Sequence, residues 1–371
     1  MLKLNGFFVL LFLTTANTNI QAQPLWETLN NKVIKEHIIP HYKGFQQTAQ
    51  TFSTHADNFC ANVSKENLQS LRNAYSQLNQ AWMRIQHIRN GPPIEQNHNY
   101  FRIQLFPDKR NAVGKHLAVL LKAENTEKLN PKKFKRLSVA LQGITALEHL
   151  LFSDKYPLDM FRASNEEKSF TCGLVLAISH SLDMLSTELV SQWTSDTTPY
   201  ALFVNVKKFP LKGNEQEKEF KARTEITSLI YNQYHTQLRS IIEHKLMLPL
   251  GKELKRSKPH FSESKFAQHS LSNISINLVA LKELYQLTYA PLLEIKSGGA
   301  EINQDILNAY DKINLQIKNI ELPLRQAVSH PQQRQAVEEL LNAVKHLHEL
   351  TVGPMQQLLA IPIRFNAMDG D

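Results

Sequence analysis

Apolar residues recur at intervals of three and four along most of the chain, the spacing of one face of an α-helix. Alternation of apolar and polar residues, which is typical of a half-buried strand, is almost absent. The pattern therefore predicts an all-α protein. The clearest stripes are Leu71, Tyr75, Leu78, Trp82 and Ile85; Leu137, Leu141, Ile144, Leu151 and Phe152; Leu174, Ile178, Leu182, Leu185 and Leu189; and Leu271, Ile274, Leu278, Leu281 and Leu284.

The helical spacing fades between Trp193 and Glu217, where two prolines and one glycine interrupt it at Pro199, Pro210 and Gly213. A chain of this length exceeds a comfortable single core, so two domains are expected. We predict a helical-bundle domain over residues 23–196, a linker over 197–216 and a second helical bundle over 217–371. The two halves could be a distant duplication, although no residue-level repeat supports it.

The first residues predict export. Lys3 precedes the apolar run Phe7–Leu13, and small or polar residues lead to Ala22. This run is too short to cross a bilayer, and no later stretch reaches about 18 consecutive apolar residues. We expect a signal peptide over residues 1–22, a periplasmic mature protein without a transmembrane segment, and, because no cysteine follows the cleavage region, no lipid anchor.

Charge and cysteine content narrow the function. The net charge of +8 is spread along the chain, with one dense run at residues 252–258. A nucleic-acid partner would favour a basic stripe interleaved with aromatic residues, so none is expected. A basic surface could face anionic envelope components or simply be solvated.

The two cysteines, Cys60 and Cys172, predict a disulfide in an oxidising compartment, with two buried free thiols as the alternative.

One carboxylate lies within an apolar stripe. On a helix predicted over residues 132–152, Glu148 falls about 20° from Leu137, amid the apolar positions. Burial of an unpaired charge is costly, so Glu148 should be paired, protonated or bound to a ligand. It is either a site residue or a structural carboxylate. Arg102, Arg110 and Lys115 are its candidate partners.

Gly143 and Thr145 share the neighbourhood of Glu148. A glycine inside a helix costs about 1 kcal/mol relative to alanine, so close approach of another helix or a ligand is expected at Gly143. Weaker metal candidates are His180 with Asp183, three residues apart, and the chain-terminal Asp369 and Asp371. His37 and His41 are four residues apart, but Pro40 is expected to break the helix between them.

The segment Gly143–Glu148 resembles the G-x-H-x-x-E signature of the imelysin family, with Thr145 in the position of the histidine. Residues 78–117, with their Trp-containing helix and Gly-Pro segment, are similar to the same family. So are the segment 139–152 and the closing residues 365–371. The resemblance covers most of the predicted mature chain.

This resemblance implies a two-domain helical fold, a periplasmic or outer-membrane location and an association with iron uptake. A metallopeptidase activity has been inferred from the family signature. A catalytic zinc ion usually has three protein ligands, often histidines, and Thr145 removes the best candidate. Zinc is therefore not expected here, whereas iron remains possible because oxygen ligands suit it.

Three hypotheses follow. The first is a non-enzymatic binding protein that holds iron, an iron chelate or another anionic ligand between its domains near Glu148. The second is a metallopeptidase, and the third is an envelope protein-interaction partner with no small ligand. A basic-lined cavity at Glu148 favours the first, three convergent ligands the second, and one Arg locked to Glu148 the third.

Overall fold

The computed structural model describes residues 28–89, 99–162, 169–195 and 215–361. All regular structure in these residues is helical, which confirms the predicted all-α class. We call residues 28–195 the N-terminal half and residues 215–361 the C-terminal half. The predicted signal peptide and most of the predicted linker lie outside the described residues. The division into two domains stays a prediction.

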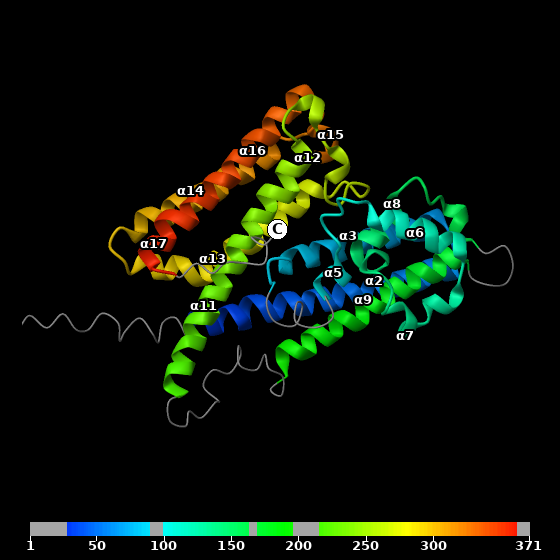
Figure 1. Ribbon diagram of the computed structural model, residues 1–371, viewed down its shortest axis with the longest axis horizontal. Helices are drawn as coiled ribbons and strands as arrows, with labels where there is room; N and C mark the ends of the chain where they lie inside the picture. Colours follow the sequence, from blue (N-terminus) through cyan, green and yellow to red (C-terminus); the bar gives the residue numbers. More distant parts are fainter. Residues whose placement is uncertain (1–27, 90–98, 163–168, 196–214, 362–371) are drawn as a thin grey trace, which may run out of the picture.

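Three long helices dominate the N-terminal half, and four dominate the C-terminal half (Figure 1). The N-terminal half contains η1 (Val33–Ile38), α2 (Ile39–Ala61), α3 (Lys65–Ile85), α5 (Asn99–Ile103), α6 (Ala112–Ala123), α7 (Pro131–Phe134), α8 (Gly143–Phe152) and α9 (Phe170–Thr194). The C-terminal half contains α11 (Glu215–Ser240), η6 (Ile241–Met247), α12 (Leu248–Leu250), α13 (Ser270–Glu294), α14 (Gly299–Lys318), α15 (Leu324–Ala327), α16 (Pro331–Leu350), η9 (Thr351–Met355) and α17 (Gln356–Leu359).

The long helices bury the stripes that the sequence predicts. All five stripe residues of α3, from Leu71 to Ile85, are completely buried. α2 packs between α3 and α9, and α13 packs on α14. α3 also contacts α13, and this contact joins the two halves of the chain (Figure 1).

Cys60 at the end of α2 and Cys172 in the first turn of α9 form a disulfide, as predicted. It fastens the first long helix of the N-terminal half to the last. By length and composition α9 is the one helix among the described residues that could cross a membrane, and half of that stretch is buried inside the protein. The core helix of a folded protein has the same properties.

The predicted continuous helix over residues 132–152 is wrong. α7 ends at Phe134, a 3-10 turn follows at Val139–Leu141, and α8 begins only at Gly143. The Ser138 side chain accepts a hydrogen bond from the Ala140 N–H and so offers the backbone an alternative to the helix. Gln142 is extended, and Gly143 has a φ of 74°. The apolar stripe spans two short elements and not one helix.

Candidate functional site

Glu148 lies on α8 at the junction of the two halves and is 4% exposed. Its Oε1 accepts hydrogen bonds from two backbone N–H groups of the C-terminal half, Phe266 at 2.7 Å and Ala267 at 3.3 Å. The predicted burial is therefore confirmed. The carboxylate connects α8 to the segment that precedes α13. Glu148 therefore has a structural role at the contact between the two halves.

Gly143 allows α8 to begin directly against α5. A Cβ at this position would overlap the carbonyl oxygens of Arg102 and Ile103. The expected close approach is confirmed, and the neighbour is the end of α5. Two residues later Thr145 donates its hydroxyl to the carbonyl of Leu105 at 3.2 Å, so this hydroxyl is already engaged.

A small cavity of about 30 Å³ lies beside Glu148, lined by residues of both halves. Asp108, Thr145 and Glu148 line it from the N-terminal half, and Ser262 and Glu263 line it from the C-terminal half. Ser262 is 4% exposed, and its Oγ has no hydrogen-bond partner among the described residues. The cavity has room for about one water molecule or a bare ion.

Burial controls the protonation of this region. Desolvation raises the pKa of Glu148 to about 7, against the opposing effect of its two backbone hydrogen bonds and of Lys265. Desolvation also lowers the pKa of the adjacent His149 to about 4, and the charge of Lys265 adds to this effect. Near neutral pH, Glu148 is therefore partly protonated, whereas His149 is uncharged.

The raised pKa predicts a pH-dependent contribution of Glu148 to stability. Between the ordinary value near 4.5 and about 7, the folded protein holds a proton that the unfolded chain releases. The contribution of Glu148 to the free energy of unfolding therefore falls as the pH rises through this window, by about 3 kcal/mol in total. Above about pH 7 this contribution is constant.

Urea unfolding of wild type and Glu148→Gln at pH 5 and pH 8 measures this effect. Buried histidines such as His149 act in the opposite direction, and the difference between the two proteins cancels their contribution. We expect the stability of wild type relative to Glu148→Gln to drop by about 2.5 kcal/mol from pH 5 to pH 8, since pH 5 already lies above the ordinary pKa of 4.5. A difference that does not change with pH would show that Glu148 keeps an ordinary pKa.

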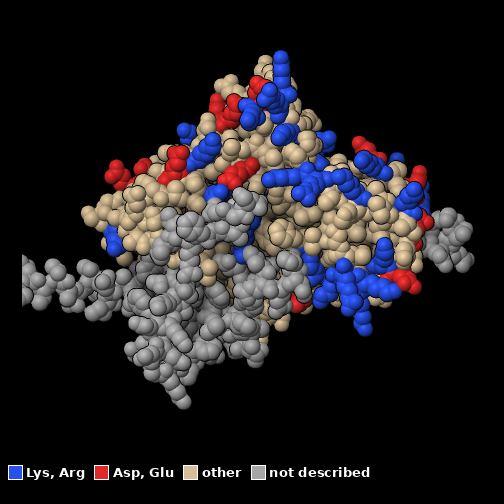
Figure 2. Space-filling model, viewed as in Figure 1, with Lys and Arg blue, Asp and Glu red and all other residues tan. Residues whose placement is uncertain are grey.

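A second, larger cavity of about 340 Å³ shares part of its lining with the first, including Asp108, His149 and Lys265. Its further lining is basic, with Lys109, Lys155 and Arg325. All three of these side chains are exposed, so they can reach a ligand from solvent. Figure 2 shows basic side chains gathered over the junction between the two halves.

The residues at Glu148 do not fit a catalytic metal ion. Such a site needs about three protein ligands and an open position. One oxygen of Glu148 is occupied by two N–H groups, and the hydroxyl of Thr145 is donated to a carbonyl. Within the part of the chain that the structure describes, three potential ligand atoms converge at one place, and Glu148 is not among them.

Neither predicted arginine reaches Glu148. Arg102 is buried and donates to Gln142 at 3.1 Å and to Asn99 at 3.0 Å. It lines a different cavity, of about 520 Å³, between α7 and α9. Arg110 is exposed. Among the described residues no arginine pairs with Glu148, because backbone donors take that place.

Of the weaker metal candidates, His180 and Asp183 lie among the described residues. His180 pairs with Asp57 of α2, with 3.3 Å between its Nε2 and the carboxylate, and both side chains are about half exposed. The pKa of Asp183 is raised by burial, and the neighbouring His180 opposes this. Asp369 and Asp371 lie outside the described residues.

Sequence reasoning missed a buried ion pair next to Glu148. Lys245 of η6 lies 2.7 Å from Glu263, and these side chains are 1% and 2% exposed. The ammonium also donates to Gln86 at 2.8 Å and Asn277 at 2.6 Å. No local signal identifies this pair, since its members lie 18 residues apart on different elements and share the acceptor Gln86 of the N-terminal half only in the folded protein.

The sequence matches the family model of Imelysin over residues 38–351. An imelysin-like protein from Psychrobacter arcticum 273-4 has a similar structure, with a TM-score of 0.73 and 18% identity over 92% of this chain and 98% of that one. An iron-regulated protein A precursor from Parabacteroides distasonis ATCC 8503 has a TM-score of 0.68 and 14% identity, over 91% and 97% of the two chains. A search of curated proteins finds no match. The matched residues span most of the sequence and both halves, so this chain belongs to the imelysin family.

Proposed function

We propose that this chain is an exported, periplasmic binding protein that takes part in iron acquisition and holds an anionic iron chelate beside Glu148. The carrying observation is the position of a basic cavity directly next to buried carboxylates at the junction of the two halves. The apolar run near the N-terminus supports export. The structurally similar protein from Parabacteroides distasonis is described as iron-regulated and as a precursor, which supports both parts of the proposal.

The sizes of the two cavities decide where a chelate would bind. The space of about 30 Å³ at Glu148 is too small for a polydentate organic ligand. The basic cavity of about 340 Å³ lies at the lower end of the range for small-molecule sites. A citrate-sized chelate would therefore occupy the basic cavity, which shares Asp108, His149 and Lys265 with the small cavity at Glu148.

Charge supports an anionic ligand. Lys109, Lys155 and Arg325 are exposed side chains of the cavity lining. Lys265 is partly buried, so desolvation lowers its pKa, and Glu148 and Asp108 oppose that effect. Cationic side chains around a concave site attract anions and strengthen their binding at low ionic strength. Arg325 can also accept a carboxylate in a bidentate arrangement.

Calorimetric titration with ferric citrate and with citrate alone tests this proposal. We expect wild type to bind ferric citrate and the double variant Lys155→Gln/Arg325→Gln to bind it at least tenfold more weakly. Both residues are exposed, so the variant should keep its fold. Lys133→Gln is the matched control, since Lys133 is exposed on α7 and does not line this cavity. Ferric citrate binding that is absent in wild type, or equal in all three proteins, would contradict the proposal.

A further inference from the structure

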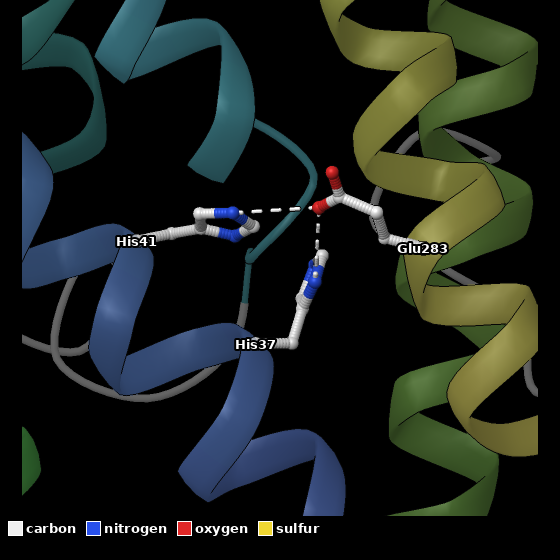
Figure 3. A group of neighbouring side chains, drawn as sticks. All are labelled: His37, His41 and Glu283. Carbon is white, nitrogen blue, oxygen red and sulfur yellow. Dashed lines mark ion pairs between the residues drawn. The ribbon is translucent and has the colours of Figure 1, made fainter.

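Three potential metal ligands converge where the first helices of the chain meet α13 (Figure 3). His37 of η1, His41 of α2 and Glu283 of α13 each offer one ligand atom, and these atoms lie within 4.8 Å of one another. His37 is buried, whereas His41 and Glu283 are partly exposed. The group therefore has a buried side and a side open to solvent, and it lies at a contact between the two halves.

The expectation that Pro40 separates the two histidines is wrong. Residues 33–38 form a wider π-helical turn, and α2 continues from Ile39 with Pro40 in its first turn. A wider turn accommodates a proline ring that would otherwise collide with the preceding turn. His37 and His41 thus remain on one face of a continuous helical segment, with ring centroids 4.5 Å apart.

The two distances from the histidine nitrogens to Glu283 fit a metal site better than they fit hydrogen bonds. Nδ1 of His37 lies 3.7 Å and Nε2 of His41 lies 3.4 Å from the same Glu283 oxygen, Oε2. These distances exceed those of good N–H···O bonds, which lie at 2.7–3.2 Å. Ligands about 2.0–2.1 Å from a tetrahedral metal are separated by about 3.3 Å from each other.

Two further residues hold the ligands in place. Nε2 of His37 lies 3.0 Å from Nε2 of the buried His87, so His37 can donate its second ring proton and present Nδ1 as a lone pair. Arg84 lies 3.2 Å from Oε1 of Glu283, the oxygen that the histidines do not face. Such outer partners orient ligands and strengthen metal sites.

The histidines are uncharged near neutral pH, as ligation requires. Burial lowers the pKa of His37 well below its usual value, and the charges of His87, His41 and Arg84 add to this. Burial also lowers the pKa of His41, although Glu283 opposes this effect. Arg84 is a charged group that faces the cluster, and it is already paired with Glu283.

We propose that His37, His41 and Glu283 form a binding site for a divalent transition-metal cation of the zinc or ferrous class. Two imidazoles and one carboxylate favour these cations over magnesium and calcium, which prefer all-oxygen sites. Three protein ligands leave a position for water on the open side. The site shares no residue with the linings of the two cavities near Glu148, so it does not depend on the function proposed above.

Calorimetric titration of the chelator-treated protein with Zn²⁺ tests the site. We expect one equivalent to bind to wild type, and Co²⁺ to give the visible absorption of a nitrogen- and oxygen-ligated site, which Zn²⁺ then removes. His41→Gln and Glu283→Gln should each weaken Zn²⁺ binding at least tenfold. His87→Gln should weaken it about tenfold through the orientation of His37. Mg²⁺ should not bind at the same concentration.

His180→Ala is the matched control, because His180 also lies beside a carboxylate but has no third ligand. It should bind Zn²⁺ as wild type does. Both ligand variants alter partly exposed side chains, and circular dichroism verifies that they fold. Failure of wild type to bind one equivalent, or equal binding by wild type and both ligand variants, would overturn the proposal and leave an ion-pair contact between the halves.

Discussion

Replacing Lys245 with methionine is expected to lower the free energy of unfolding by about 3–5 kcal/mol. The substitution leaves Glu263 buried without its cationic partner, at a site where both side chains are almost completely inaccessible. Gln86, Gln104 and Asn273 would still donate to the carboxylate, but they cannot compensate its charge. Urea unfolding followed by circular dichroism measures the loss.

Two control proteins separate the effect of an uncompensated buried charge from the effect of losing a lysine side chain. Lys133→Met removes a pair with Glu127 of similar length, 2.6 Å, but these side chains are 58% and 75% exposed. Its cost should stay below about 1 kcal/mol. The double variant Lys245→Met/Glu263→Gln should recover much of the stability, because it removes the uncompensated charge. A loss of less than 1 kcal/mol in Lys245→Met would show that the charge of Glu263 is compensated at little cost without Lys245.

The same ion pair marks a limit of prediction from sequence. The burial of α3 and α9 follows from local spacing, because a helix places every third or fourth residue on one face. The disulfide between Cys60 and Cys172 follows from composition and compartment. Lys245 gives no such signal, since its acceptor Gln86 lies 159 residues away in the sequence.

Glu148 shows the same contrast between burial, which the sequence predicts, and contacts, which it does not. Its position among apolar residues predicts burial, and the structure agrees. Its partners were not predictable, because they are backbone N–H groups about 118 residues away, and every residue except proline carries such a donor. At Pro40, a rule about helix interiors gave the wrong result because the π-helical turn before it accommodates the ring. Apart from the disulfide, local patterns predicted which residues are buried but not which residues they contact.

Gly143→Ala is expected to destabilise the protein by about 2–5 kcal/mol, and the cause lies in the backbone. A positive φ of 74° costs a residue with a Cβ about 1–2 kcal/mol. The new methyl group would also overlap the carbonyl oxygens of Arg102 and Ile103, and displacing backbone in a packed region costs about 1–3 kcal/mol more. Urea unfolding measures the total.

The matched control is Gly44→Ala in the interior of α2, where a Cβ would meet nothing within 4 Å. This change should stabilise the protein by up to about 1 kcal/mol, since alanine favours helix. Because α8 must move away from α5 in Gly143→Ala, Glu148 should lose contact with the N–H groups of Phe266 and Ala267. Their amide hydrogen exchange should accelerate in Gly143→Ala but not in Gly44→Ala. Unchanged exchange together with an unchanged unfolding free energy would mean that α8 does not depend on glycine at its first residue, and that the junction at Glu148 tolerates a shift of this helix.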